Sequence, residues 1–231
     1  MRLGIFTDAH YASREISCGK RFNNRSLRKI KEAYSAFQDA RCDLIICLGD
    51  LTDTEETHEQ EAANLRSIAQ VIQSCPIPSV CLMGNHDAFA FSEKEFYQIL
   101  GGCQPTVRCI SGKCLIFLDA CYFATGTHYA PGDSDWTDTH LPDPAALEDQ
   151  LKSVSGDTYV FIHQNLDPAI PEDHRLDNAD LVLDILSRSG TVKTVYQGHY
   201  HPGKVGSYHG LRLVTFPAMC EGEKAFYIED I

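Results

Sequence analysis

The sequence predicts an α/β fold built on a mixed sheet. Five apolar runs, rich in β-branched and aromatic side chains, have the length and composition of buried strands. These runs are Leu3–Phe6, Leu44–Leu48, Val80–Met83, Tyr159–Ile162 and Val192–Tyr196. Helical periodicity follows the first two runs, which gives a βαβαβ order. Apolar pairs around Ser111-Gly112 and His209-Gly210 have the pattern of hairpins, so the sheet is not purely parallel.

Helices are expected where apolar residues recur every three or four positions, or where a capping residue precedes such a segment. The segments that meet these criteria are 27–37, 65–72, 92–100, 143–151 and 178–189. The remaining strands are expected at 106–110, 115–118, 204–208, 212–216 and 225–228. The first four of these remaining strands form two hairpins, and the last follows the second hairpin.

Each of the five buried runs is followed by polar residues. The clusters are Asp8-Ala9-His10, Gly49-Asp50, Gly84-Asn85-His86-Asp87, His163 and Gly198-His199-Tyr200-His201. The carboxyl ends of strands in open α/β sheets meet at the ligand site, so these clusters should converge. Asp8 and His10 are two residues apart and would point to the same side of an extended strand end. The pair His199 and His201 has the same spacing.

The residue types in these clusters indicate a two-metal hydrolytic site. Imidazole and carboxylate groups are the ligands that suit manganese, iron, zinc and nickel. Asp50 is the natural bridge, because its two carboxylate oxygens can hold two cations at once. Each cluster alone has an ordinary interpretation as a capped turn, a partly buried histidine or an exposed loop. The joint interpretation is favoured because the clusters occur in a fixed order after five strand-like runs.

These clusters match, in order, the pattern D-x-H, G-D, G-N-H-D/E, H, G-H-x-H, and the chain therefore resembles the calcineurin-like metallophosphoesterase superfamily. The resemblance implies an αββα sandwich of two facing mixed sheets flanked by helices, with metals at the carboxyl ends of the strands. The implied ligands are Asp8, His10 and His201 for one ion, Asn85, His163 and His199 for the other, and Asp50 as the bridge.

The resemblance also implies a reaction. A metal-bridging hydroxide would attack phosphorus in line, His86 would be the proton donor or transition-state stabiliser, and Asp87 would orient His86. Asp53 is a further candidate for an orienting residue. The expected enzyme is a hydrolase that uses two divalent or transition-metal ions, either manganese, iron, zinc or nickel. Its small-molecule substrate would carry a phosphodiester or phosphoanhydride bond.

The chain looks most like the small bacterial-type cyclic-nucleotide phosphodiesterase and nucleotide-diphosphate hydrolase branch. It has Asp87 where related protein phosphatases have Glu, and it lacks the Arg that they place soon afterwards. A phosphomonoesterase acting on a small phosphorylated metabolite is the main alternative. A non-catalytic metal-binding scaffold is a weaker one, because His86, Asp87 and every ligand position are present.

Two loops are candidates for the walls of a substrate site. The loop 11–24 carries Arg14 and Arg21, part of a positively charged island in an acidic chain. The segment 122–142 is long enough to cap the metals. Its Trp136 could stack on a nucleobase or could instead be a buried anchor of a surface loop. Arg14, Arg21 and Trp136 are therefore the substrate-binding candidates.

Composition limits the partners. The chain of 231 residues is expected to form one domain, 1–231. A net charge of −12 argues against a nucleic-acid coat-binding surface and an anionic membrane partner. The sequence shows no signal-peptide or transmembrane pattern, so a cytoplasmic location is expected, and it leaves the oligomeric state open. The ten cysteines are expected to be reduced core residues, with Cys18 and Cys220 the most reactive.

Overall fold

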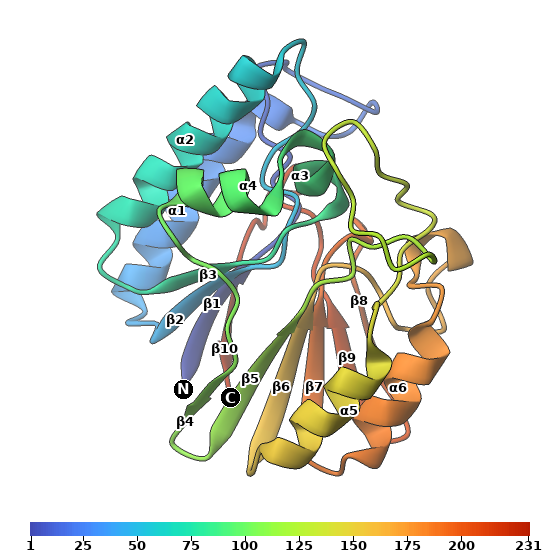
Figure 1. The fold of residues 1–231 in the computed structure, drawn as a ribbon. Helices are drawn as coiled ribbons and strands as arrows, with labels where there is room; N and C mark the ends of the chain where they lie inside the picture. The colour runs from blue at the N-terminus through green and yellow to red at the C-terminus, as the bar shows by residue number, and fades with distance from the viewer.

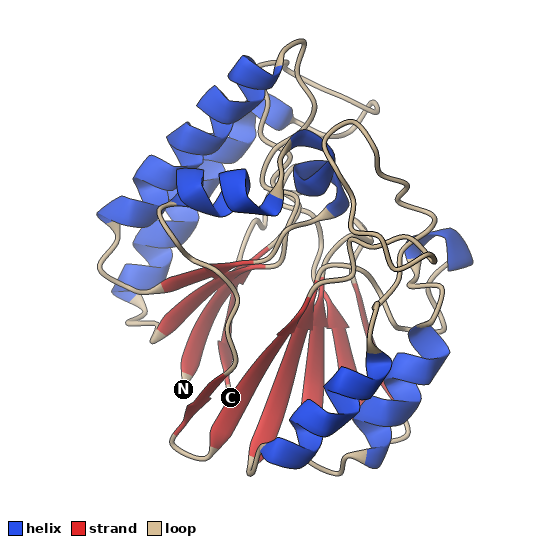
Figure 2. Cartoon of the chain, viewed as in Figure 1, coloured by secondary structure: helices blue, strands red, loops and turns tan.

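Two mixed β-sheets face each other, and helices cover the outer face of each (Figures 1 and 2). The computed structural model describes all 231 residues. The first sheet has the strand order β10-β1-β2-β3. Its strands are β1 (Arg2–Phe6), β2 (Leu44–Cys47), β3 (Ser79–Cys81) and β10 (Tyr227–Asp230). β1, β2 and β3 are parallel, and β10 pairs antiparallel with β1, which brings the two chain termini side by side.

The second sheet has the order β4-β5-β6-β7-β9-β8. Its strands are β4 (Arg108–Ile110), β5 (Lys113–Leu118), β6 (Asp157–Ile162), β7 (Val192–Gln197), β8 (Lys204–Tyr208) and β9 (Leu211–Thr215). The four central strands are parallel, whereas the edge strands β4 and β8 form antiparallel hairpins with β5 and β9. The predicted mixed sheets and both hairpins are confirmed.

The helices pack in two groups (Figure 1). Three cover the first sheet, namely α1 (Ser26–Asp39), α2 (His58–Ser74) and α4 (Glu93–Leu100), and two cover the second, namely α5 (Pro144–Ser153) and α6 (Ala179–Arg188). Short 3-10 turns span Asn23–Arg25 and Glu172–His174. The sequence-predicted cap of α4 is confirmed, because the Ser92 side chain accepts a hydrogen bond from the backbone N–H of Glu95. The αββα sandwich expected from the sequence is therefore the observed fold.

Aromatic rings fill the space between the two sheets. Phe161 on β6 stacks on Phe117 of β5 with ring centroids 5.0 Å apart, and on Tyr196 of β7 at 5.2 Å. Tyr196 in turn stacks on Phe216 at 5.9 Å. Neighbouring parallel strands place equivalent side chains in register, so one face of the second sheet carries a continuous row of rings. This row packs against the apolar face of the first sheet and fixes the relative position of the two sheets.

One helix was not expected from the sequence. α3 (Asn85–Ala90) begins within the polar cluster that follows β3, where the sequence predicts only a strand end. The Asp87 carboxylate accepts a hydrogen bond from the backbone N–H of Gly84, which stabilises the first turn of this helix. A helix of six residues has too short an apolar period to be recognised from the sequence.

The cysteines differ from the expectation at two places. Cys114 was expected to be a free core residue, but it forms a disulfide with Cys109 across the β4–β5 hairpin. Cys220 was expected in polar, reactive surroundings, but its side chain is fully buried, and burial raises the pKa of its thiol. Cys18, the other cysteine expected to be reactive, is exposed. No helix of the structure combines the length and apolar composition that crossing a membrane requires.

Candidate metal centre

The five polar clusters lie together at the carboxyl ends of β1, β2, β3, β6 and β7, where the loops of the two sheets meet (Figure 1). Backbone hydrogen bonds connect these loops directly. The N–H of Asp8 donates to the carbonyl of Gly49 at 3.0 Å, and the N–H of His10 donates to the carbonyl of Asp50 at 2.9 Å. On the second sheet, the N–H of Gly198 donates to the carbonyl of His163 at 3.0 Å. The clusters therefore form one continuous site.

Three side chains form a first candidate metal group. Nε2 of His10 lies 3.2 Å from Nε2 of His201, and Oδ1 of Asp8 lies 3.7 and 3.5 Å from these two nitrogens. The point equidistant from the three atoms lies about 2 Å from each, which is the length of a metal–nitrogen or metal–oxygen bond to zinc. All three side chains are nearly or fully buried. Their geometry fits a divalent or transition-metal ion.

A second candidate group adjoins the first. Nε2 of His163 lies 3.4 Å from Oδ2 of Asp50, and His199 completes a cluster whose ligand atoms are all within 4.8 Å of one another. The same Oδ2 of Asp50 lies 3.5 Å from Nε2 of His10. Asp50 thus contacts residues of both groups.

Several atoms of these groups are buried without a hydrogen-bond partner. They are Oδ1 of Asp8, Nδ1 of His10, Nε2 of His163 and Nε2 of His199, and Oδ1 of the adjoining Asn85 is a fifth such atom. A buried polar atom without a partner costs about 1–3 kcal/mol, so a protein rarely keeps several of them in one place unless something binds there. The unpartnered atoms are all of types that bind metal ions, which agrees with the geometry.

Hydrogen bonds to the second oxygen orient each carboxylate. Oδ2 of Asp8 accepts from the Thr7 hydroxyl at 2.6 Å and from the backbone N–H of His199 at 3.0 Å. Oδ1 of Asp50 accepts from the backbone N–H of His86 at 2.9 Å. In both residues the remaining oxygen faces the histidines, and the neighbouring groups hold it there.

The imidazoles are oriented in the same way. Nδ1 of His163 lies 2.9 Å from the carbonyl oxygen of Leu48, which can only accept, so Nδ1 carries a proton and Nε2 is the nitrogen directed into the site. Nδ1 of His201 is hydrogen-bonded to the carboxylate of Glu221, which leaves Nε2 facing Asp8 and His10. Glu221 also lies 3.4 Å from the ammonium of Lys20. Sequence reasoning missed Glu221, because nothing local relates it to the G-H-x-H cluster.

The backbone at the site differs from the expected extended strand ends. Asp8, His10, Asp50 and His199 all have positive φ, at 52°, 44°, 54° and 63°. The expectation that the residues of each Asp-x-His or His-x-His pair point to one side of an extended strand is therefore wrong. The side chains converge through left-handed turns, which cost non-glycine residues free energy and commonly occur at functional sites.

Two glycines allow the loops to approach each other closely. A Cβ atom at Gly84 would lie 2.1 Å from Oδ1 of Asp50. A Cβ atom at Gly198 would lie 2.1 Å from the hydroxyl oxygen of Thr7 and 2.8 Å from Oδ2 of Asp8. Any larger residue would displace the carboxylates from their present positions.

Protonation in the metal-free protein follows from burial and neighbouring charge. Burial and the adjacent His86 lower the pKa of His10 to about 4, and burial and His163 lower the pKa of His199 to about 3. Both imidazoles are therefore neutral near pH 7, as metal ligands must be. Burial would lower the pKa of His163 as well, but the charge of Asp50 outweighs it and raises that pKa to about 10. Burial alone would raise the pKa of the Asp50 carboxyl, but the surrounding histidines outweigh burial and lower that pKa.

The expected contact between Asp87 and His86 is not formed. Both oxygens of Asp87 are fully engaged by the backbone N–H groups of Leu51, Thr52 and Gly84, at 3.0 to 3.1 Å. Burial and the charge of Asp50 raise the pKa of Asp87 to about 7. Asp87 therefore connects the loops after β2 and β3, and its contacts stabilise the fold around the site.

Asp53 makes the contact that was expected of Asp87. Its Oδ1 lies 3.2 Å from Nδ1 of His86, and its Oδ2 accepts a hydrogen bond from the buried side-chain amide of Asn23. Burial would lower the pKa of His86, but the charges of Asp50 and Asp53 outweigh it and place that pKa above its ordinary value. The side chain of Asp53 is buried, so it is not part of a solvated acidic surface.

A cavity of about 330 Å³ opens over the two groups. Its wall contains Asp50, Asn85, His86, His199, His201 and Glu221, together with Cys18, Lys20, Arg21, Trp136, His174, Tyr200 and Pro202. Of the three substrate-binding candidates, Arg21 and Trp136 therefore line the cavity. Arg14 is exposed and does not. Sequence reasoning missed His174, whereas Tyr200 belongs to the predicted Gly198–His201 cluster.

The segment 122–142 reaches this cavity. The N–H of Gly132 donates to the carbonyl of Phe89 in α3, which ties the segment to the first sheet's loops. Its Trp136 ring lies 5.1 Å from the ring of His174 and 6.2 Å from that of His199. The alternative of a buried tryptophan anchor is wrong, because Trp136 is 42% exposed.

Fold and site together define a class of proteins, the αββα hydrolases with a dinuclear metal centre at the carboxyl ends of their strands. The chain belongs to the calcineurin-like phosphoesterase family, whose model matches residues 1–203. It is accordingly a hydrolase of the metallophosphoesterase type. The family is dimetal-dependent, and the two histidine and aspartate groups described above are the candidate sites.

The relatives include a probable cyclic nucleotide phosphodiesterase of Psychrobacter arcticus, 26% identical over 215 residues that cover 85% of this chain and 70% of the relative. The 3',5'-cyclic adenosine monophosphate phosphodiesterase CpdA of Escherichia coli K12 is 25% identical, over 95% of this chain and 76% of its own length. A dimetal phosphatase of Danio rerio has the same fold, with a TM-score of 0.82 at 15% identity, over 99% of this chain and 91% of that one.

Proposed function

We propose that this protein hydrolyses phosphodiester or phosphoanhydride bonds of small, nucleotide-like substrates. The observation that carries the proposal is the pair of adjoining metal groups that share Asp50 and lie beneath a cavity with cationic and aromatic walls. The cyclic nucleotide phosphodiesterases among its relatives support the diester as the preferred substrate.

The ligands proposed here are those that the resemblance implies, and the geometry supports most of them. Asp8, His10 and His201 would hold one ion, Asn85, His163 and His199 the other, and Asp50 would contact both. When bound, two such ions activate a water molecule and stabilise the charge that develops on the phosphoryl oxygens. The orphaned buried atoms of Asp8, Asn85, His163 and His199 support this distribution.

His86 is the proposed proton donor to the leaving oxygen. It lines the cavity beside Asn85, and its ring is partly exposed there. Asp53 is the proposed positioning residue, because its carboxylate contacts Nδ1 and favours the protonated imidazole. With Nδ1 held by Asp53, Nε2 is the nitrogen left to deliver a proton to a departing oxygen.

The wall of the cavity supports a nucleotide as the substrate. Lys20 and Arg21 supply positive charge next to the metal groups, which favours an anionic phosphate in a chain of net charge −12. Trp136 and Tyr200 offer aromatic surfaces at the same opening. Stacking of a base on an aromatic ring contributes about 1–3 kcal/mol to binding.

The direct test is metal-dependent hydrolysis. The full chain is freed of metal by chelation, reloaded with manganese, iron, zinc or nickel, and assayed with bis-p-nitrophenyl phosphate, p-nitrophenyl phosphate and a panel of cyclic and diphosphate nucleotides. We expect metal-restored cleavage of the diesters or phosphoanhydrides. A clear preference for the monoester would favour the phosphomonoesterase, and two bound ions without any cleavage would favour the scaffold.

Two substitutions separate binding from turnover. Asp50→Asn removes a charge shared by both metal groups and should lose metal and activity together. His86→Gln should keep both ions and lose about 10²–10⁴-fold in kcat, the usual contribution of a general acid. His209→Gln, in the exposed turn between β8 and β9, is the control. Unchanged turnover of His86→Gln at saturating substrate would remove His86 from the mechanism.

A further inference from the structure

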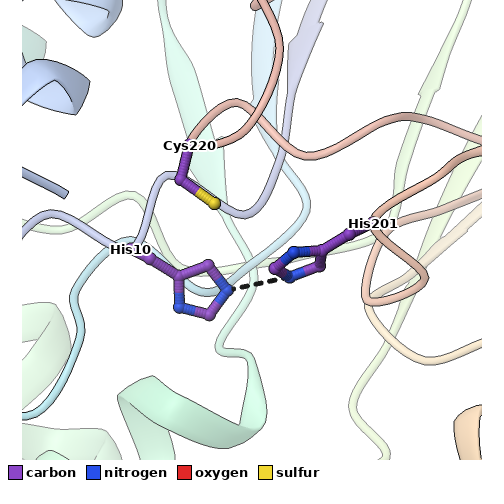
Figure 3. Close-up of side chains that lie close together, drawn as sticks. All are labelled: His10, His201 and Cys220. Carbon is purple, nitrogen blue, oxygen red and sulfur yellow. Dashed lines mark hydrogen bonds between the residues drawn. The ribbon is translucent and has the colours of Figure 1, made fainter. Parts of the chain in front are cut away.

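The segment after β9 brings a cysteine to the first metal group. Sγ of Cys220 belongs with His10 and His201 to a cluster whose ligand atoms all lie within 4.8 Å of one another. Figure 3 shows the sulfur directed toward the space between the two imidazole rings. Oδ1 of Asp8, buried and without a hydrogen-bond partner, faces the same two rings. Three potential ligand atoms therefore lie close together here, and Oδ1 of Asp8 lies within 3.7 Å of both imidazole nitrogens.

The backbone holds Cys220 at this position from both sides. Its N–H donates to the carbonyl of Asp8 at 3.1 Å, and its carbonyl accepts from the N–H of Phe22 at 2.9 Å. One residue earlier, the N–H of Met219 donates to the carbonyl of Thr7 at 3.0 Å. These bonds tie the cysteine to the residues that follow β1, which carry Asp8 and His10.

A buried lysine adds a further restraint to the same segment. The ammonium of Lys29, on α1, donates to the carbonyl oxygens of Met219 and Gly222, both at 2.7 Å. The side chain of Lys29 is nearly buried, so breaking these bonds would leave a charge without partners. Cys220 is therefore held between two anchored positions.

The thiol of Cys220 also differs from those of two other buried cysteines, Cys47 and Cys121. The thiols of Cys47 and Cys121 lie within weak hydrogen-bonding distance of backbone carbonyls. The thiol of Cys220 makes no hydrogen bond, although it is fully buried next to three polar groups. A thiol kept at such a place without a polar partner is free to bind an ion.

We propose that Cys220 is a thiolate ligand of the first metal ion, together with Asp8, His10 and His201. On binding, the sulfur–metal bond forms and the thiol proton is released to solvent. The inference rests on the proposed two-metal centre and adds a consequence for metal choice. Thiolate ligands favour zinc, and by the same softness cobalt, over manganese, which prefers carboxylate and water.

Cobalt substitution provides a readout that does not depend on activity. The chelated full chain is reloaded with Co²⁺, its cobalt content is measured, and its near-ultraviolet spectrum is recorded. We expect a sulfur-to-cobalt charge-transfer band in the unmodified protein. Cys220→Ser and Cys220→Ala should lose the band. Cys42→Ser is the control and should keep it, because Cys42 is a buried cysteine just before β2, at the end of that strand away from the metal groups.

The outcomes distinguish this inference from the proposed function. Two bound cobalt ions without a charge-transfer band would overturn the assignment of Cys220 and leave the two-metal centre intact. A band that persists in Cys220→Ser would also overturn it. A chain that binds no ion would overturn both. Because the unmodified protein is measured first, a variant that fails to fold does not remove the test.

Competition between metals gives a second, independent measurement. Zinc and manganese are offered together to the metal-free chain, and the ratio of bound ions is determined by elemental analysis. We expect the preference for zinc over manganese to fall about tenfold or more in Cys220→Ser. Replacing even a residue that only hydrogen-bonds to a metal ligand costs about 10–100-fold in metal affinity. An unchanged ratio in a variant that still binds two ions would contradict the proposal.

Discussion

Individual residues at the metal centre carry local costs that the surrounding structure compensates. A non-glycine residue in a sparsely populated backbone region costs about 1–3 kcal/mol, and Asp8, His10, Asp50 and His199 all occupy the left-handed region. Backbone hydrogen bonds between the loops hold the first three in place. The site is therefore assembled by the loops around it and is not a property of any one loop.

Asp87 is the first residue whose role can be tested by stability. Its carboxylate is fully buried and accepts from three backbone N–H groups, so an asparagine would set its own amide N–H₂ against some of these donors. At pH 8 without metal, Asp87→Asn should lower the free energy of unfolding by about 1–3 kcal/mol. Urea denaturation measures this loss, with the exposed Asp149→Asn as control. Equal midpoints for Asp87→Asn and the unmodified chain would contradict it.

Glu221 should influence metal affinity through His201. Its carboxylate is hydrogen-bonded to Nδ1 of His201 and thereby fixes which ring nitrogen faces the ion. Glu221→Gln should weaken the first ion by about 10–100-fold and leave the second unchanged, measured by competition with a chromogenic chelator. Glu223→Gln, two residues further on and exposed, should behave as the unmodified chain. Equal weakening of both ions would mean that Glu221 acts on the whole fold.

At the scale of elements, the segment 122–142 depends on a few polar contacts for its position. The hydroxyl of Tyr129 donates to the carbonyls of Asp135 and Asp138, and Nε2 of His128 lies 3.1 Å from Oδ2 of Asp119. The Asp119 contact raises the pKa of His128 above its ordinary value, with burial opposing it. The attachment of this segment should therefore vary with pH.

The sign of this dependence follows from the raised pKa. The ion pair contributes its full stabilisation below the unfolded pKa of about 6.5, and this is lost as pH rises through the higher folded pKa. The difference in unfolding free energy between the unmodified chain and His128→Gln should be largest near pH 5.5 and vanish near pH 9, at about 1 kcal/mol or less. Denaturant titrations at several pH values measure it. A difference that grows with pH would reverse the assignment.

α3 shows why some elements cannot be read from local pattern. Its residues Asn85–Ala90 lack a helical apolar period of useful length. The helix is stabilised by Asp87, whose carboxylate also binds the backbone of Leu51 and Thr52 on the neighbouring loop. By contrast, α1 and α2 show several turns of periodic apolar residues, and both were predicted.

For the whole molecule, the aromatic row between the sheets should dominate stability. Phe161 is fully buried and stacks on two rings of its own sheet, and it immediately precedes the end of β6 that leads to His163. Phe161→Ala should cost about 3–5 kcal/mol in unfolding free energy, measured by guanidinium denaturation. Phe161→Leu, which keeps most of the volume, should cost clearly less. Similar losses for both would mean that the cavity is not the cause.

Several features followed from the sequence alone. The periods of apolar residues determined the strands and main helices, because strand and helix periodicity depends only on neighbouring positions. The polar residues after β1, β2, β3, β6 and β7 predicted a shared site, because ligands bind at the carboxyl ends of strands in α/β sheets. These strands lie in two facing sheets whose carboxyl ends meet. The α/β class and the shared site were therefore predictable from the residues, and the resemblance of the motifs to a known family added the sandwich architecture.

Only the tertiary structure decided which side chains touch. It paired His86 with Asp53 and not with Asp87, placed Glu221 behind His201 and brought Cys220 to the first metal group. These contacts join residues up to 210 positions apart, such as His10 and Cys220, and depend on left-handed turns that no periodicity reveals. Distance along the chain does not limit contact in the folded state, so the packing of the two sheets had to be known first.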